Sequence, residues 1–218
     1  MTGINRTLWG LGTPRTLRPL WTLIELELAF EHIKIAPRSP GMDNSEFRAL
    51  TQRQKVPFYK DDRVQIGESA AIINYLADRY GKTVLSMPKP GTLERATLMD
   101  HTMYLMTEID ARLYTTRLHG EAPSGLSATY GSAPIAIEAA KEYVSRGLRE
   151  AARWFTEGQQ YAQGEYFSTV DILLVSCLDW ASARDIALPT LLADYRDKIA
   201  SRPGYIEASA QNMPARAR

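Results

Sequence analysis

Hydroxyl side chains stand where the sequence predicts that helices begin. Thr13 and Thr16 lie at the start of the first predicted helix, and Ser69 opens another helix over residues 69–80. The first amides of a helix have no partner inside it, and the positive end of the helix dipole lies there. A hydroxyl at such a position can therefore help to bind an anion. The structural alternative is that these residues only cap their helices.

Other residue types with characteristic chemistry form no recognisable motif. The three histidines, His32, His101 and His119, are widely spaced, so we expect no metal site. Residues 10–12 lack the third glycine of a dinucleotide-binding loop. The single cysteine, Cys177, lies in an apolar stretch, where a small core side chain is the expected role.

The composition is that of an ordinary globular protein. Lysine and arginine total 26 against 25 aspartate and glutamate residues, so the net charge is +1 and no broad positive field favours nucleic acid. Hydrophobic residues make up 44% of the 218 residues, which is enough for a buried core. One cysteine cannot form an internal disulfide, no apolar run reaches the roughly 20 residues of a membrane span, and the first residues show no secretion signal. We therefore expect a cytoplasmic protein without a membrane partner.

The first 80 residues mix strand and helix periodicities. The pattern predicts strands over 7–11 and 32–35, a hairpin of strands over 56–59 and 63–66, and helices over 17–28, 45–51 and 69–80. The hairpin turn is expected at Asp61 and Asp62. Gly81 is predicted to close the last of these helices in the left-handed conformation, which glycine tolerates.

Beyond a proline-containing connector at residues 81–91, the sequence shows only helical patterns. Apolar stripes predict helices over 93–113 and 135–155, and a helix over 168–180 is apolar on most faces, which is typical of the centre of a bundle. Ser168 and Asp171 have the spacing of a capping box at its start, and we interpret them as structural. The sequence therefore predicts an α/β domain followed by an all-α domain.

Five short motifs, in this order, resemble those of the cytosolic glutathione S-transferases, with a first-helix motif that is similar to the serine-type motif of bacterial members. They lie at residues 12–18, 55–57, 68–72, 168–171 and 202–205, and their sequences are GTPRTLR, KVP, ESAAI, STVD and RPGY. The resemblance spans nearly the whole chain. It implies a thioredoxin-like N-terminal domain over residues 1–81 and an all-helical bundle domain over residues 91–218.

The resemblance implies glutathione as co-substrate, bound in the N-terminal domain. Glu68 and Ser69 match the family's pair that holds the γ-glutamyl end, since a carboxylate accepts from its ammonium and a helix-start hydroxyl suits its carboxylate. Pro57 is expected in the cis form, and the main chain of Val56 would then pair with the cysteinyl part of glutathione. Three residues are candidates for binding the glycine carboxylate, Lys55, Gln54 and Arg38, and the alternative for each is a solvated position on the surface.

The family carries a serine, tyrosine or cysteine near the start of the first helix to activate the thiol, whereas this chain offers threonine. Thr13 precedes Pro14, which suits the first helical position and makes Thr13 an expected N-cap. Pro19 instead favours a helix that is capped at Thr16, so both hydroxyls are candidates. The lack of a cysteine at this place disfavours dithiol chemistry.

The activity that the resemblance implies is transfer of glutathione to a small, largely apolar electrophile, as in detoxification, without a metal. Met103, Tyr104 and Met106 are candidates for the hydrophobic substrate pocket, with core or dimer packing as the alternative. A homodimer is also implied. Alternatives on the same fold are a glutathione-dependent peroxidase, isomerase or etherase, and a non-catalytic interaction module.

Overall fold

The structure, a computed structural model, describes residues 6–214. Its contacts divide the chain into two compact units. The first unit holds the residues up to Met87 together with those from Ser201 onward, and the second unit spans Pro88–Ala200. The boundary after Met87 therefore lies inside the predicted connector.

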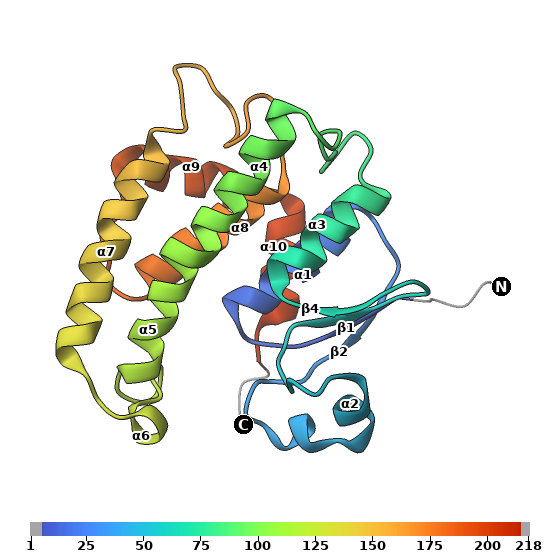
Figure 1. Cartoon of the computed structure of the whole chain (residues 1–218), viewed down its shortest axis with the longest axis vertical. Helices are drawn as coiled ribbons and strands as arrows, with labels where there is room; N and C mark the ends of the chain where they lie inside the picture. Colours follow the sequence, from blue (N-terminus) through green and yellow to red (C-terminus); the bar gives the residue numbers. More distant parts are fainter. Residues whose placement is uncertain (1–5, 215–218) are drawn as a thin grey trace. The chain divides into compact units, whose positions relative to one another are not determined.

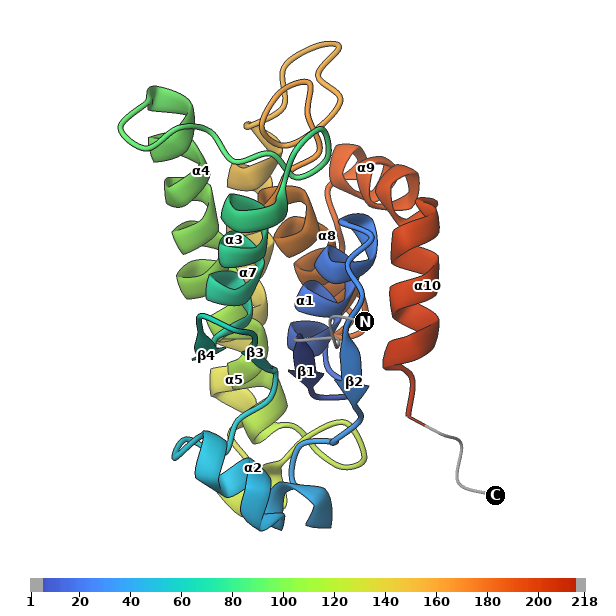
Figure 2. The ribbon, with the colours of Figure 1, turned by 90° about the vertical axis from the view of Figure 1, so that its right-hand side faces the viewer.

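One helix departs from the domain limits that the sequence predicts. Residues 203–212 fall within the helical domain predicted over 91–218, but they form α10 (Pro203–Asn212), which belongs to the first unit. The reason is packing, because α10 lies along α1 (Pro14–Glu25), shown in red and blue in Figure 2. The rings of Trp21 and Tyr205 meet edge to face between them, with centroids 5.1 Å apart.

The first unit contains a four-stranded mixed sheet in the order β2-β1-β3-β4 (Figure 1, with all four strands labelled in Figure 2). Its strands are β1 (Thr7–Trp9), β2 (Glu31–Ile33), β3 (Phe58–Lys60) and β4 (Gln65–Gly67). β1 and β2 are parallel, with Leu8 opposite His32, and α1 supplies the crossover that a parallel pair requires. The pairs β1–β3 and β3–β4 are antiparallel. This order confirms the predicted thioredoxin-like fold.

The helices of the first unit lie close to their predicted positions. A short 3₁₀ turn (Pro40–Asp43) precedes α2 (Ser45–Leu50), and α3 spans Ser69–Tyr80 as expected. α1 contacts α3, and each helix turns fully buried apolar side chains inward, including Trp21 on α1 and Ile73 on α3. The start of each of these two helices is therefore fixed by a packed core.

Gly81 ends α3, but it does not adopt the predicted left-handed conformation. Its φ is −62° and its ψ is 136°, which is extended backbone open to any residue. Space explains the glycine instead, because an added Cβ would lie 2.2 Å from the carbonyl oxygen of Leu85 and 2.5 Å from that of Ala77.

The second unit consists of helices joined by loops, as predicted. The helices are α4 (Leu93–Tyr104), α5 (Ala111–His119), α6 (Ser127–Tyr130), α7 (Pro134–Ala152), α8 (Thr169–Ser182) and α9 (Thr190–Ala200). A π-helical segment, Leu105–Asp110, interrupts the helix predicted over 93–113. α7 approaches this segment closely, since a Cβ on Gly147 would lie 2.5 Å from Cδ1 of Ile109. Among residues 6–214, none of the helices combines the length and the apolar composition that crossing a membrane requires.

α8 is the buried helix that the sequence predicts, and residues 170–178 are all buried, Cys177 included. The capping box at its start is confirmed. The amide and hydroxyl of Ser168 donate to Oδ2 of Asp171 at 2.6 and 2.7 Å, and the amide of Ala162 donates to Oδ1 at 2.7 Å. The hydroxyl of Tyr195 also donates to Asp171. Asp171 therefore has a structural role, as expected.

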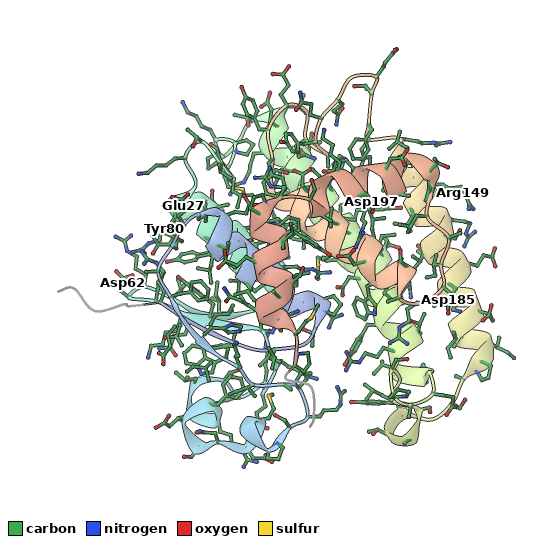
Figure 3. All side chains as sticks on the ribbon, turned by 180° about the vertical axis from the view of Figure 1, so that it is seen from behind. Glu27, Asp62, Tyr80, Arg149, Asp185 and Asp197 are labelled. Carbon is green, nitrogen blue, oxygen red and sulfur yellow. The ribbon has the colours of Figure 1, made fainter. Side chains whose placement is uncertain are left out.

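The hairpin of β3 and β4 is confirmed, and each strand begins two residues later than predicted. Its turn is organised by Asp61, which accepts from the amides of Arg63 and Val64 and from the hydroxyl of Tyr75 at 2.7 Å. Asp62 and Tyr80, which both contact Arg79, lie at the same edge of the unit (Figure 3). Burial opposes ionisation of Asp61, but these hydrogen bonds outweigh it and hold the pKa of the carboxyl below its usual value.

We expect Asp61→Asn to lower the free energy of unfolding by about 1–3 kcal/mol at pH 7, because several buried donors lose a charged acceptor. Since the folded-state pKa is lowered, this stabilisation is complete at neutral pH. It is lost as the pH falls below about 3.9 and through the folded-state pKa.

Urea unfolding at pH 7 and pH 3 measures both effects. The exposed Asp62→Asn is the matched control, and we expect it to cost under about 1 kcal/mol. A difference between Asp61→Asn and the unmodified protein that is as large at pH 3 as at pH 7 would contradict the electrostatic account.

Candidate functional site

The loop between β1 and α1 brings its backbone very close to the start of α1. Gly10 has a φ of +139°, and an added Cβ would lie 2.8 Å from Oγ1 of Thr16. The amide of Gly10 donates to the carbonyl of Ile33 at 3.1 Å, and Nε2–H of His32 donates to the carbonyl of Gly10 at 2.8 Å. Burial lowers the pKa of His32, which keeps the imidazole neutral at pH 7. β2 therefore holds one side of this loop.

Thr13 and Thr16 are brought together at the start of α1. Thr13 is the N-cap, and its Oγ1 accepts from the amide of Thr16 at 2.9 Å, so the alternative of a helix capped at Thr16 is wrong. The two hydroxyl oxygens lie 2.9 Å apart. Thr16 is fully buried and Thr13 is 8% exposed. When the Thr16 hydroxyl donates to Oγ1 of Thr13, the hydroxyl proton of Thr13 is available to a further acceptor.

Ser69 lies at the start of α3 against a buried arginine. A guanidinium nitrogen of Arg18, on α1, donates to Oγ of Ser69 at 3.1 Å, and both side chains are buried. Because Oγ of Ser69 accepts from Arg18, its hydroxyl proton remains available to an acceptor at the same helix end as the first amides of α3, where the helix dipole is positive. This arrangement suits a carboxylate, and the nearby cation strengthens the preference.

Arg18 is a residue that the sequence analysis did not select as a candidate. The sequence feature that could have indicated it is an arginine among the apolar residues Leu17, Leu20 and Trp21, which are buried in α1. Arginine is almost never fully buried without partners, so a charge within an apolar stripe marks either a structural network or a ligand site. Here it marks the contact with Ser69.

Glu68 precedes α3 with a φ of +61°, and its side chain makes no capping bond. Its carboxylate lies 3.3 Å from the guanidinium of Arg53, with both side chains mostly exposed. Glu68 and Lys55 line one groove of about 500 Å³ in the first unit. Gln54 and Arg38 are not among the described residues that line it. Of the three candidates for binding the glycine carboxylate, the groove therefore favours Lys55.

The Val56–Pro57 peptide bond is cis, as the resemblance implies. Among residues 6–214, no hydrogen bond engages the main chain of Val56, which lies just before β3. Its N–H and C=O groups are therefore available to an extended peptide.

The predicted pocket residues lie in the second unit. Tyr104 donates its hydroxyl to the carbonyl of Gly147 at 3.1 Å and meets the ring of Trp154 edge to face. Met103 is 51% exposed, and Met106 is partly buried. Tyr104 thus packs against α7, whereas Met103 is open to solvent.

Comparison with known proteins decides the family. The family model of the glutathione S-transferase N-terminal domain matches residues 12–84, and the model of the glutathione S-transferase C-terminal domain matches residues 114–203. The chain belongs to the cytosolic glutathione S-transferase family. The N-terminal match contains every candidate of the first unit, from Thr13 to Ser69.

Relatives and solved structures agree with this assignment. Glutathione S-transferase GstB of Escherichia coli (strain K12) is 38% identical over 88 residues, covering 38% of this chain and 42% of the relative. Glutathione S-transferase 3 of Schizosaccharomyces pombe is 32% identical over 95 residues, covering 44% of this chain and 37% of the relative. The chain thus spans about two fifths of the length of the curated relatives it matches.

The glutathione transferase from Methylococcus capsulatus str. Bath has a TM-score of 0.80 at 23% identity, covering 94% of this chain and 98% of that one. The theta class glutathione S-transferase from Xanthomonas axonopodis pv. citri, solved with glutathione bound, has a TM-score of 0.76 at 22% identity, covering 99% and 100%. These similarities establish the glutathione S-transferase fold for both units.

We expect Gly10→Ala to destabilise the protein more than a glycine substitution that also lies at a positive φ but has free space around it. Gly158→Ala is the matched control, since Gly158 also has a positive φ, +79°, and nothing lies within 4 Å of an added Cβ. The control should cost about 1 kcal/mol for the backbone alone. Gly10→Ala should cost about 1–3 kcal/mol more, because the methyl group meets Thr16 and because alanine adopts a φ of +139° less readily than +79°. Equal urea midpoints for the two variants would show that the close approach carries no energy.

Proposed function

We propose that the protein is a glutathione transferase that activates the thiol of glutathione for attack on a small, largely apolar electrophile. The observation that carries the proposal is the Ser69 hydroxyl at the start of α3, held by the buried guanidinium of Arg18 at 3.1 Å. A hydroxyl, free helix amides and a fixed positive charge at one point form a site for a carboxylate.

The γ-glutamyl end of glutathione carries both a carboxylate and an ammonium. Its carboxylate binds the Ser69 hydroxyl and the first amides of α3, and the buried guanidinium of Arg18, which donates to Ser69, supplies positive charge. Its ammonium binds Glu68, whose carboxylate lies beside the same helix end and is exposed. Ammonium binding therefore competes with Arg53 for Glu68, an exposed pair of small energy.

The rest of glutathione extends from this end. The cysteinyl main chain pairs with the N–H and C=O groups of Val56, next to Pro57, as an added strand does. The glycine carboxylate binds Lys55, which lines the same groove as Glu68.

The thiol lies at the start of α1, where the Thr13 hydroxyl donates to the thiolate and Thr16 donates to Thr13. A free cysteine thiol has a pKa of about 8.5, and lowering it by two units takes about 2.7 kcal/mol. A hydrogen bond to a charged acceptor supplies about 1.5–3 kcal/mol and a helix N-terminus about 0.3–1. The two effects together are sufficient.

In the reaction the thiolate sulfur forms a bond to the electrophilic carbon, and the leaving group departs with the electron pair of the broken bond. In an addition the pair moves onto the acceptor instead. Met103, Tyr104 and Met106 are proposed to contact the apolar part of the electrophile. We further propose that the protein is a cytoplasmic homodimer that uses glutathione as co-substrate and needs no metal.

Calorimetric titration with glutathione, followed by turnover of an activated aryl halide, tests this function. We expect the unmodified protein to bind and to conjugate. Ser69→Ala should weaken binding about 10- to 100-fold, since a hydrogen bond to a charged group is lost. Ser45→Ala is the matched control, because Ser45 occupies the same first position of α2, and it should bind normally.

A loss under two-fold for Ser69→Ala would remove Ser69 from the site. Binding without turnover of any electrophile class would favour a non-catalytic module.

We also expect Thr13→Ala to raise the pKa of the bound thiol by about 1–2 units, the equivalent of one charge-assisted hydrogen bond. Thr13→Ser retains the hydroxyl and should keep the pKa low. Thr16→Ala should act in the same direction but less strongly. Thiolate absorbance as a function of pH, at saturating glutathione, gives the three values. Thiol activation by these hydroxyls is wrong when neither alanine variant raises the pKa by half a unit.

A further inference from the structure

α10 is anchored firmly at the end of α1 that lies far from Thr13. The guanidinium of Arg202 donates twice to the carboxylate of Glu25, at 2.8 and 2.7 Å, and Nε1 of Trp21 donates to the same carboxylate at 2.9 Å. An added Cβ on Gly204 would lie 2.7 Å from Oε1 of Glu25. The first turn of α10 is therefore pressed against the last turn of α1.

The other end of α10 reaches the loop that carries Thr13. Asn212, its last residue, accepts from the amide of Gly12 through Oδ1 at 2.9 Å, and its Nδ2 donates to the carbonyl of Thr13 at 3.0 Å. The main-chain carbonyl of Asn212 also accepts from the amide of Gly12, at 3.0 Å. One carboxamide thus binds the backbone on both sides of the Gly12–Thr13 peptide link.

The contact with Asn212 is made at Gly12, a residue type whose backbone angles are intrinsically little restricted. Gly12 has a φ of +74°, a region that glycine enters without penalty and leaves as readily. The backbone angles of Thr13 set the direction of its Cβ, and through Cβ the direction of its Oγ1. A carboxamide can donate and accept at once, which neither a carboxylate nor an apolar side chain can do.

We propose that Asn212 is a positioning residue for thiol activation: it fixes the Gly12–Thr13 backbone so that the Thr13 hydroxyl points at the sulfur of bound glutathione. The proposal rests on the proposed function, because it assumes that Thr13 serves the thiol. Asn212 itself contacts neither glutathione nor the electrophile in this account. Its loss therefore affects the ionisation of the thiol and leaves the binding of the tripeptide nearly intact.

The test compares Asn212→Ala with Gln211→Ala, a neighbouring carboxamide on α10 that donates to Glu207 at 2.9 Å, away from the loop. Thiolate absorbance against pH gives the pKa of bound glutathione, and calorimetry gives its dissociation constant. We expect Asn212→Ala to raise the thiol pKa by at least half a unit, with affinity changed less than about three-fold. Turnover at pH 7 should fall and should recover toward that of the unmodified protein at high pH. Gln211→Ala should match the unmodified protein.

A second variant keeps the test decisive when Asn212→Ala folds poorly. Asn212→Asp has nearly the same size and still accepts from Gly12, but it cannot donate to Thr13. Its added charge also disfavours a thiolate, so the titration is repeated at 1 M salt, where exposed charges are screened within about 3 Å. A raised pKa that persists there supports positioning, and one that disappears overturns it.

Two outcomes separate the proposals. A normal thiol pKa in an Asn212→Ala protein that binds glutathione, while Thr13→Ala raises it, overturns the role of Asn212 alone. A loss of affinity and turnover in equal measure at every pH shows a merely structural contact and also overturns it. No glutathione binding by the unmodified protein overturns the proposed function, and this inference with it.

Discussion

The hydrogen bond from the guanidinium of Arg18 to the hydroxyl of Ser69 is the interaction on which the proposed site depends. It links α1 to α3 at the point where both helices are packed against the same core. A buried charge is costly unless hydrogen bonds satisfy it, so neither side chain is free to move without loss of stability. The cation also gives the start of α3 a fixed preference for an anion. The same pair thus links two helices of the fold and, in the proposed function, favours a carboxylate at the start of α3.

In the proposed site, two helix starts bind two of the three anionic groups of glutathione. The start of α3 suits a carboxylate, and the start of α1, with Thr13 and Thr16 in contact, suits a thiolate. Hydroxyls are neutral donors, so each site gains its selectivity from the surrounding amides, dipole and buried charge rather than from a surface cation. Pre-oriented donors of this kind need no reorganisation during the reaction, which is where electrostatic stabilisation gains most.

Local patterns predicted much of this arrangement, because helices and hairpins depend on neighbours in the sequence. The limits of α3 and the capping box of Ser168 and Asp171 follow from spacing and residue type, whereas local patterns left Thr13 and Thr16 as alternatives for the N-cap of α1. The sequence correctly predicts that Gly81 ends α3, but the predicted reason is wrong. A glycine is needed there because the carbonyl oxygen of Leu85 leaves no space for a Cβ. Arg18 and the packing of α10 depend on contacts between distant segments, and no local pattern carries that information.

The contact between Asn212 and Gly12 joins residues 200 positions apart, so its geometry exists only after the intervening chain has folded. Closing so long a loop costs entropy that local contacts do not repay, and here the Arg202–Glu25 pair and the Trp21–Tyr205 contact help to offset that cost. These contacts stabilise α10, while its last residue contacts a loop that contains two glycines with positive φ, Gly10 and Gly12. In the proposal, α10 therefore completes a site to which the starts of α1 and α3 also contribute. On the proposed roles of Thr13 and Asn212, the orientation of the Thr13 hydroxyl depends on the stability of α10, and a change that loosens α10 alters the ionisation of the thiol through the Gly12–Thr13 backbone.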